Sequence, residues 1–160
     1  MDANLFASSP DFEHDGVALR GVGSAAGAEL LGATAYELQP GTRWADLHYH
    51  HANEELLLVL EGRPTVHTLD ASRQVGPGDV VAFLRGRRGA HRISNDTDAV
   101  VRFVLVSTMV MPEVVEYPDT GNVFVMSEPP WTDAPYDEAR GRVIRSFTKS
   151  DGRPVPPDAD

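Results

Sequence analysis

"LHYHHANEELLLVLEG", residues 47–62, places three histidines within four positions, just before two glutamates and an aliphatic run that ends at a glycine. Side chains alternate along a β-strand, so residues two apart share a face. We therefore expect His48 and His50 to point to the same side of a strand and His51 to point to the other side. The stretch thus predicts a pair of imidazoles on one face of a sheet.

The second half of this stretch predicts a partner strand that begins after the turn "HAN". On it, alternation places Glu55 on the same face as Leu57 and Val59, while Glu54 belongs to the opposite face. A hairpin between the two strands folds Glu55 back toward His48 and His50. Two imidazoles and one carboxylate are then expected to meet inside the fold.

The rest of the chain to about residue 112 also reads as short strands separated by turn residues. "AELLGATAYEL" allows a strand or a short helix, and Gly32 together with the following "QPG" favours the strand. No alternation of strands and helices is visible, which excludes an α/β fold. We predict an all-β sandwich or barrel from short strands such as "GVALRGVG", "RPTVHTLD", "RQVGPGDVVAFL" and "AVVRFVLVSTMV".

The composition narrows the classes of function. The 160 residues suit one domain, and the absence of cysteine means that any metal must be held by nitrogen and oxygen ligands. A formal net charge of −10 argues against nucleic-acid and anionic-membrane partners, because both need a basic surface. No apolar run approaches the length of a membrane span, and we expect a cytoplasmic protein.

A further histidine downstream strengthens the prediction of a metal site. His91 follows a glycine turn and an apolar strand in "GPGDVVAFLRGRRGAHRISN". Together with His48, His50 and Glu55 it forms a set of three imidazoles and one carboxylate. These ligands suit Zn, Fe, Ni, Mn or Cu, and we expect one such divalent metal per chain.

The segment "GTRWADLHYHHANEELLLVLEG" closely resembles the first cupin motif, G-(x)5-H-x-H-(x)3–4-E-(x)6-G. His48, His50, Glu55 and Gly62 match its spacing, and Gly41 lies one residue further from the histidines than the pattern asks. The resemblance implies a small β-barrel of jelly-roll type, often dimeric, with a metal inside the barrel mouth. His48, His50 and Glu55 are the metal ligands that it implies.

The second cupin motif, G-(x)5-P-x-G-(x)2-H-(x)3-N, resembles "GDVVAFLRGRRGAHRISN". Gly78, Gly86, His91 and Asn95 are in place. This copy departs from the pattern twice, because Leu84 stands where the proline belongs and four residues separate Gly86 from His91. The resemblance implies that His91 is the fourth metal ligand.

We expect three parts in the chain: an N-terminal arm over 1–15, the cupin barrel over 16–125, and a proline-rich C-terminal extension over 126–160. The extension is expected to add one strand and to end in a disordered tail. Within it, "EPPWTDAPY" reads as an arm against a partner subunit or as a lid over the barrel mouth. The fold class is thus an all-β jelly roll with extended N- and C-terminal arms.

Several residues beside the metal ligands are candidates for contact with a small molecule. Glu54 is the one extra acid next to the ligands and is the candidate general base. Arg85 could hold an anionic group, and Tyr49 and Phe83 could line a pocket, although both aromatic side chains suit a plain core equally well.

Two functions remain open from the sequence. In the first, the protein is a metal-dependent enzyme of oxygenase, isomerase or decarboxylase type that acts on a small anionic or aromatic molecule. In the second, it is a non-catalytic binding or regulatory module. The fold does not separate the two, because one barrel supports many chemistries. A homodimer is expected in either case.

Overall fold

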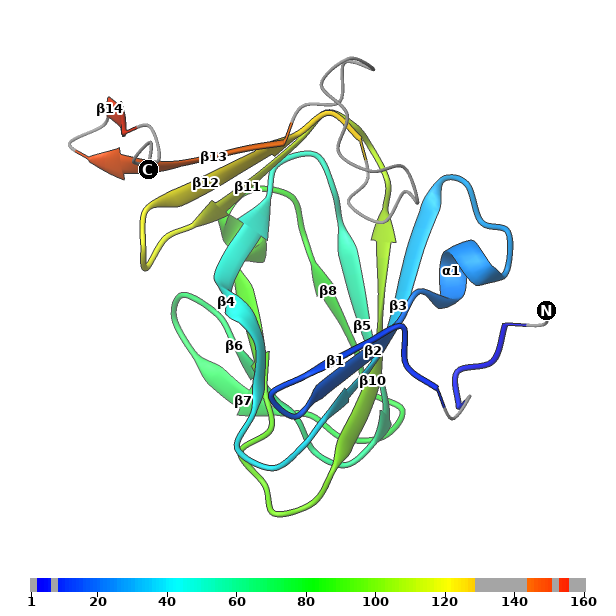
Figure 1. The fold of residues 1–160 in the computed structure, drawn as a ribbon. Coiled ribbons are helices and arrows are strands. Elements are labelled where there is room, and N and C mark those ends of the chain that lie inside the picture. The colour runs from blue at the N-terminus through cyan, green and yellow to red at the C-terminus, as the bar shows by residue number, and fades with distance from the viewer. Residues whose placement is uncertain (1–2, 7–8, 129–143, 151–152, 156–160) are drawn as a thin grey trace.

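The computed structural model describes residues 3–6, 9–128, 144–150 and 153–155, and it consists of two antiparallel sheets that face each other (Figure 1). The first sheet has six strands in the order β1-β2-β3-β10-β5-β8. Their bounds are β1 Phe12–His14, β2 Val17–Arg20, β3 Leu31–Leu38, β10 Val101–Thr108, β5 Glu55–Glu61 and β8 Val80–Phe83.

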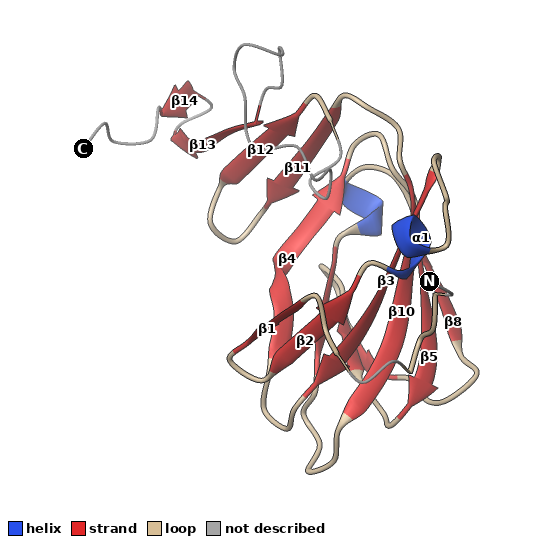
Figure 2. Ribbon diagram, turned by 45° about the vertical axis from the view of Figure 1, so that its right-hand side comes forward, coloured by secondary structure: helices blue, strands red, loops and turns tan. Residues whose placement is uncertain are grey.

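The second sheet has eight strands in the order β14-β13-β12-β11-β4-β9-β6-β7. Figure 2 shows β4 to the left of β3 and β10, with β11 and β12 beside its upper end. The bounds are β14 Arg153–Val155, β13 Ile144–Ser150, β12 Asn122–Met126, β11 Glu113–Tyr117, β4 Arg43–His50, β9 His91–Ser94, β6 Thr65–His67 and β7 Ser72–Gln74. The all-β prediction is confirmed.

The space between the sheets is filled by the inward-facing side chains that alternation predicts. Leu57 and Val59 on β5 are buried. Leu56, which lies between Glu55 and Leu57, is 42 % exposed. Phe103 on β10 and Ile93 on β9 close the core from the two sheets. Burial of such aliphatic and aromatic side chains supplies the main favourable term for folding. The predicted faces of β5 are therefore confirmed.

The two helical turns of the described chain lie at the ends of strands. "AELLGATAYEL" forms β3 in its second part, as predicted, while the preceding glycine-rich stretch forms the short helix α1 (Val22–Ala25). A 3-10 turn, η1 (Arg87–Gly89), follows β8. The sequence did not predict either turn, because each spans a single turn without an amphipathic pattern. No helix among the described residues is long and apolar enough to cross a membrane.

Gly62 ends β5 for a geometric reason. Its φ is +76°, and a Cβ at this position would lie 2.7 Å from Val101 Cγ1 and 2.8 Å from the carbonyl oxygen of Val100. Only glycine accepts both the left-handed backbone and this close approach. The turn therefore sets where β5 stops.

The predicted division into arm, barrel and extension stays a prediction. β1 lies within the predicted N-terminal arm and pairs with β2, and β13 of the predicted extension pairs with β12. Figure 1 shows β13 and β14 reaching outward beside β12. Residues 129–136 of "EPPWTDAPY" and the predicted tail at 156–160 lie outside the described residues.

Candidate metal centre

Two neighbouring strands of the second sheet bring three histidines together. β4 and β9 are antiparallel, and His48 lies directly opposite His91 in their register. The centroids of these two imidazole rings are 4.7 Å apart, and that of His50 lies 5.2 Å from His48. His48 and His50 share the inner face because they are two residues apart on one strand.

Glu55, the first residue of β5, completes the cluster from the opposite sheet. Its Oε2 lies 3.3 Å from His50 Nε2 and 3.2 Å from His91 Nε2. One ligand atom each from His48, His50 and Glu55 all lie within 4.8 Å of one another. Three of the four predicted ligands, His48, His50 and Glu55, thus form one group, and His91 lies beside it, in contact with Glu55.

The two residues inserted before His91 do not carry it away from the cluster. They are absorbed by η1, which follows Gly86 at a φ of +74°. At its end Gly89 packs so tightly that an added Cβ would lie 1.6 Å from the carbonyl oxygen of Leu84. The chain therefore enters β9 in the register that places His91 opposite His48.

Backbone carbonyls set the orientation of two of the rings. His48 Nδ1 donates a hydrogen bond of 2.8 Å to the carbonyl oxygen of Asp46, and His91 Nδ1 donates one of 3.0 Å to that of Gly89. A carbonyl oxygen only accepts, so each Nδ1 carries a proton, and in the neutral form of each ring the lone pair is on Nε2. Such outer partners fix the tautomer of metal-binding histidines.

Glu113, which the sequence did not reveal, supports the cluster from behind. It is fully buried on β11, and its Oε2 lies 3.5 Å from His50 Nδ1. Asn53 donates a further hydrogen bond to Oε2. Its other oxygen, Oε1, accepts hydrogen bonds from the backbone N–H groups of His51 at 3.1 Å, Ala52 at 3.1 Å and Val114 at 2.7 Å. One carboxylate thereby holds both the turn after β4 and the ring of His50.

The electrostatics of the cluster favour a cation. Burial opposes a charge on His50, but the carboxylates of Glu113 and Glu55 outweigh it and raise the pKa of His50 to about 9. Burial, with the nearby rings of His91 and His50, lowers the pKa of His48 to about 4. Burial would raise the pKa of Glu55, yet its imidazole neighbours keep it far below the usual value. The carboxylates thus favour positive charge at this point, beside the neutral imidazole of His48.

The donor atoms of this cluster fit a metal ion of borderline hardness. Within the described chain, the buried side-chain atoms without a hydrogen-bond partner are His50 Nδ1, Glu55 Oε2, His91 Nε2 and Arg92 Nε. Buried polar atoms normally have partners, so three such atoms in one cluster call for an explanation. A metal ion bound by imidazole nitrogens and a carboxylate oxygen would satisfy Glu55 Oε2 and His91 Nε2 at once.

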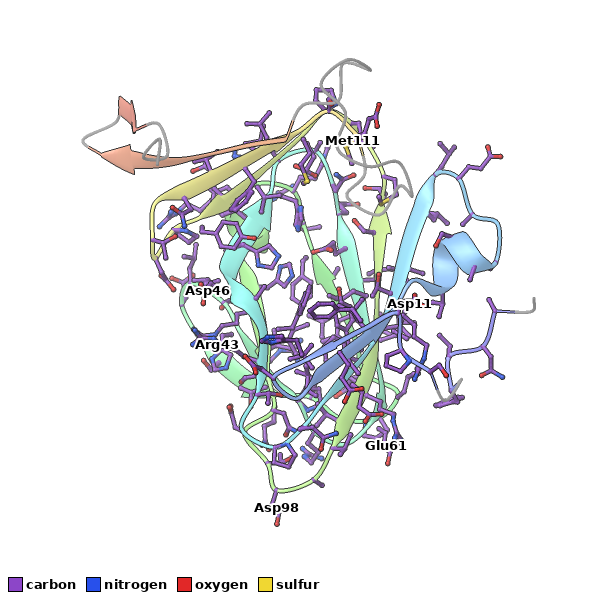
Figure 3. All side chains as sticks on the ribbon, viewed as in Figure 1. Asp11, Arg43, Asp46, Glu61, Asp98 and Met111 are labelled. Carbon is purple, nitrogen blue, oxygen red and sulfur yellow. The ribbon has the colours of Figure 1, made fainter. Side chains whose placement is uncertain are left out.

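A cavity of about 280 Å³ opens onto the cluster at the end of the barrel where β3 begins and β10 ends. His50, Glu55 and Glu113 form part of its wall. Figure 3 labels Met111 at this end, opposite Asp98 at the other end. The other lining residues that we use below are Glu29, Leu31, Thr34, Tyr36, Leu105, Ser107, Met109, Met111 and Met126.

The other residues singled out in the sequence lie around the cluster, and none of them lines this cavity. Phe83 stacks on His91 with ring centroids 3.8 Å apart, so it packs against a candidate ligand. Tyr49 is buried on the opposite face of β4, against His51. Glu54 and Arg85 are exposed. Catalysis by Glu54 and substrate contacts by Tyr49, Phe83 and Arg85 stay predictions.

The fold and the cluster define a class of protein: a small double-sheet barrel with histidine and glutamate side chains gathered at its open end. Residues 35–107 match the family model described as the cupin domain. This part of the chain is therefore similar to cupin domains. No protein among the curated sequences matches this chain significantly.

Solved structures give the same fold. A sugar phosphate isomerase of the cupin superfamily from Silicibacter pomeroyi is 28 % identical, with 88 % of this chain and 81 % of that chain covered and a TM-score of 0.71. A candidate sugar phosphate isomerase from Acidithiobacillus ferrooxidans is also 28 % identical, with 68 % and 69 % covered and a TM-score of 0.64. A polyketide cyclase from Streptomyces resistomycificus is 25 % identical, with 59 % and 66 % covered and a TM-score of 0.51.

Proposed function

We propose that this cupin binds one divalent transition metal through His48, His50, Glu55 and His91, and that it isomerises a small hydroxycarbonyl compound in the adjoining cavity. The observation that carries the proposal is that the buried Glu55 Oε2 and His91 Nε2 lack hydrogen-bond partners beside a cavity that reaches Glu55 and His50. The similarity to sugar phosphate isomerases supports this reaction type over oxygenation and decarboxylation.

The metal, Tyr36 and the cavity walls would have separate roles in the reaction. The bound metal would supply Lewis-acid polarisation of a carbonyl or hydroxyl oxygen. Tyr36 lines the cavity, and its hydroxyl is hydrogen-bonded to Thr34. Burial, with the charge of Glu55, raises the pKa of Tyr36, so its hydroxyl keeps its proton and can donate to a substrate oxygen. The buried walls would exclude water from the reacting atoms.

We expect the purified protein to hold about one transition metal per chain when it is produced in metal-supplemented medium. The reason is that one cluster of four ligand residues is present and its unpaired atoms need a partner. Elemental analysis by mass spectrometry after gel filtration measures the ratio. A metal content near that of the buffer would contradict the proposed site.

The reaction is tested by incubating metal-loaded protein with small hydroxyaldehydes and hydroxyketones and following their interconversion by NMR. The proposal requires interconversion that His50→Ala abolishes. Oxygen uptake with phenols or thiols, without interconversion, would identify an oxygenase instead. Silence across both panels, together with a tightly retained ligand, would favour the non-catalytic binder.

The homodimer and the cytoplasmic location stay predictions, and one surface supports the first of them. On the outer face of the six-stranded sheet, Leu56 pairs with Ala82 and Leu58 with Val80. Leu56 and Val80 are 42 % and 59 % exposed. Contiguous apolar side chains on an outer face are typical of protein interfaces. Light scattering should give twice the chain mass of 17.4 kDa, and a single-chain mass would contradict the dimer.

A further inference from the structure

Building on the metal site proposed above, we propose that the cavity selects a molecule whose metal-binding oxygens are joined to an uncharged, largely apolar remainder. It would then bind poorly any molecule that carries a phosphate or carboxylate on the part remote from the metal. The inference rests on how the cavity wall changes character with distance from the ligands.

Hydroxyl groups lie at the end of the cavity near the ligands. Ser107 on β10 is directly opposite Glu55 in the register between β10 and β5. Thr34 and Tyr36 follow on β3, two residues apart and on the same inner face. All three side chains line the cavity. Hydroxyls can donate to or accept from uncharged oxygens of a molecule held against the metal.

Flexible apolar side chains line the remaining wall of the cavity. Met109 and Met111 follow the end of β10, Met126 ends β12, and Leu31 begins β3. Thioether side chains adapt to irregular apolar shapes and make favourable contacts with aromatic rings. This wall therefore suits an apolar group and offers little to a hydrated one.

The charges along the cavity disfavour an anionic group. The described lining residues include three glutamates, Glu29, Glu55 and Glu113, and neither arginine nor lysine. Glu113 is already satisfied by its hydrogen bonds, and Glu29 leaves a negative charge at the exposed rim. A phosphate or carboxylate remote from the metal would lose its hydration without meeting an arginine or lysine of the described lining.

The arginines closest in sequence to the lining residues do not line the cavity. Arg20 donates hydrogen bonds to the carbonyl oxygens of Ser9 and Leu5. Arg102 forms ion pairs of 2.8 and 2.6 Å with Glu37 and Glu61. Arg85, which the sequence suggested for an anionic substrate, is exposed outside this lining. The described wall therefore lacks the cation that recognition of a phosphate group requires.

The test uses two probes that share one metal-binding group and differ in the charge of the far end: benzohydroxamic acid and 4-carboxybenzohydroxamic acid. Each is titrated into the Co²⁺-loaded full chain, and the visible absorption of the metal reports binding. We expect the neutral probe to bind roughly tenfold more tightly or better, because burial of an unpaired carboxylate is costly.

A pair of variants assigns the selection to the cavity. Met111→Lys places a cation in the apolar wall and should shift the preference toward the carboxylated probe. Val110→Lys is the matched control, because Val110 is the neighbouring residue, 53 % exposed and outside the lining. It should leave the preference unchanged.

The outcomes separate the two proposals. Equal binding of the probes, tighter binding of the carboxylated probe, or binding of neither by Co²⁺-loaded protein would overturn the selection while leaving the metal site intact. Failure of the protein to take up Co²⁺ would overturn the metal site itself and, with it, the selection built on it.

Discussion

Replacing His48 and His50 together by alanine is expected to weaken metal binding by more than about 100-fold, beyond the loss caused by removing an outer partner of a ligand. Both imidazoles project from β4 into the cluster, so the double variant keeps only Glu55 and His91. The barrel should still form, because its core consists of apolar side chains from both sheets. Competition with a chromophoric chelator measures the affinity, and circular dichroism measures the fold.

His14→Ala is the matched control for this double variant. His14 lies on β1 with a side chain that is 68 % exposed, and it contacts Asp15 instead of the cluster. It should bind metal as the unaltered chain does. Full metal content in the double variant would refute the proposed ligands, and an unfolded double variant would show that the metal has a structural role.

Glu113→Ala is expected to have the second largest effect, and it should act on both stability and metal binding. The change removes the carboxylate acceptor of the Ala52 and Val114 backbone N–H groups. The His51 N–H and the Asn53 amide also lose a hydrogen bond, but they keep the carbonyl oxygens of Val114 and Val110 as acceptors. Since each buried donor left unpaired costs about 1–3 kcal/mol and two donors lose their acceptor, we expect a loss of about 2 kcal/mol or more in the free energy of unfolding. Loss of the carboxylate charge 3.5 Å from His50 Nδ1 should weaken metal binding by about 10–100-fold.

Chemical denaturation of the metal-free protein and chelator competition separate these two effects. Glu116→Ala is the matched control, because Glu116 lies on the same strand and contacts His51 Nε2 at 2.9 Å, outside the cluster. A partly exposed pair of this kind contributes at most about 1 kcal/mol. If Glu113→Ala cost no more than Glu116→Ala, the carboxylate would not hold the turn after β4.

Much of the candidate site could be predicted because it depends on local periodicity. The two-residue spacing of His48 and His50 places both on one face, and the offset from Glu54 to Glu55 decides which carboxylate turns inward. The structure confirms these faces through the burial of Leu57 beside the exposed Leu56. Such features follow from the pleat of a strand wherever one of its faces is buried.

The remaining parts of the site depend on contacts between distant segments. Glu113 meets the turn after β4 across about sixty positions of sequence, and its segment carried no local signal of a buried carboxylate. The cavity likewise draws Leu31, Met111 and Met126 from three separate strand ends. Single-sequence patterns do not encode which ends meet, since long-range packing selects them.

The sequence by itself determined the all-β class, the inward faces of β4 and β5, and the cupin spacing of the histidines and glutamate, because a period of two survives in any strand with one buried face. Only the tertiary structure decided that η1 returns His91 to a position opposite His48, that Glu113 holds His50, and that the cavity is lined by methionines with no arginine among its described residues. These outcomes depend on close packing between segments far apart in the chain, where each side chain is placed by neighbours that local sequence does not name.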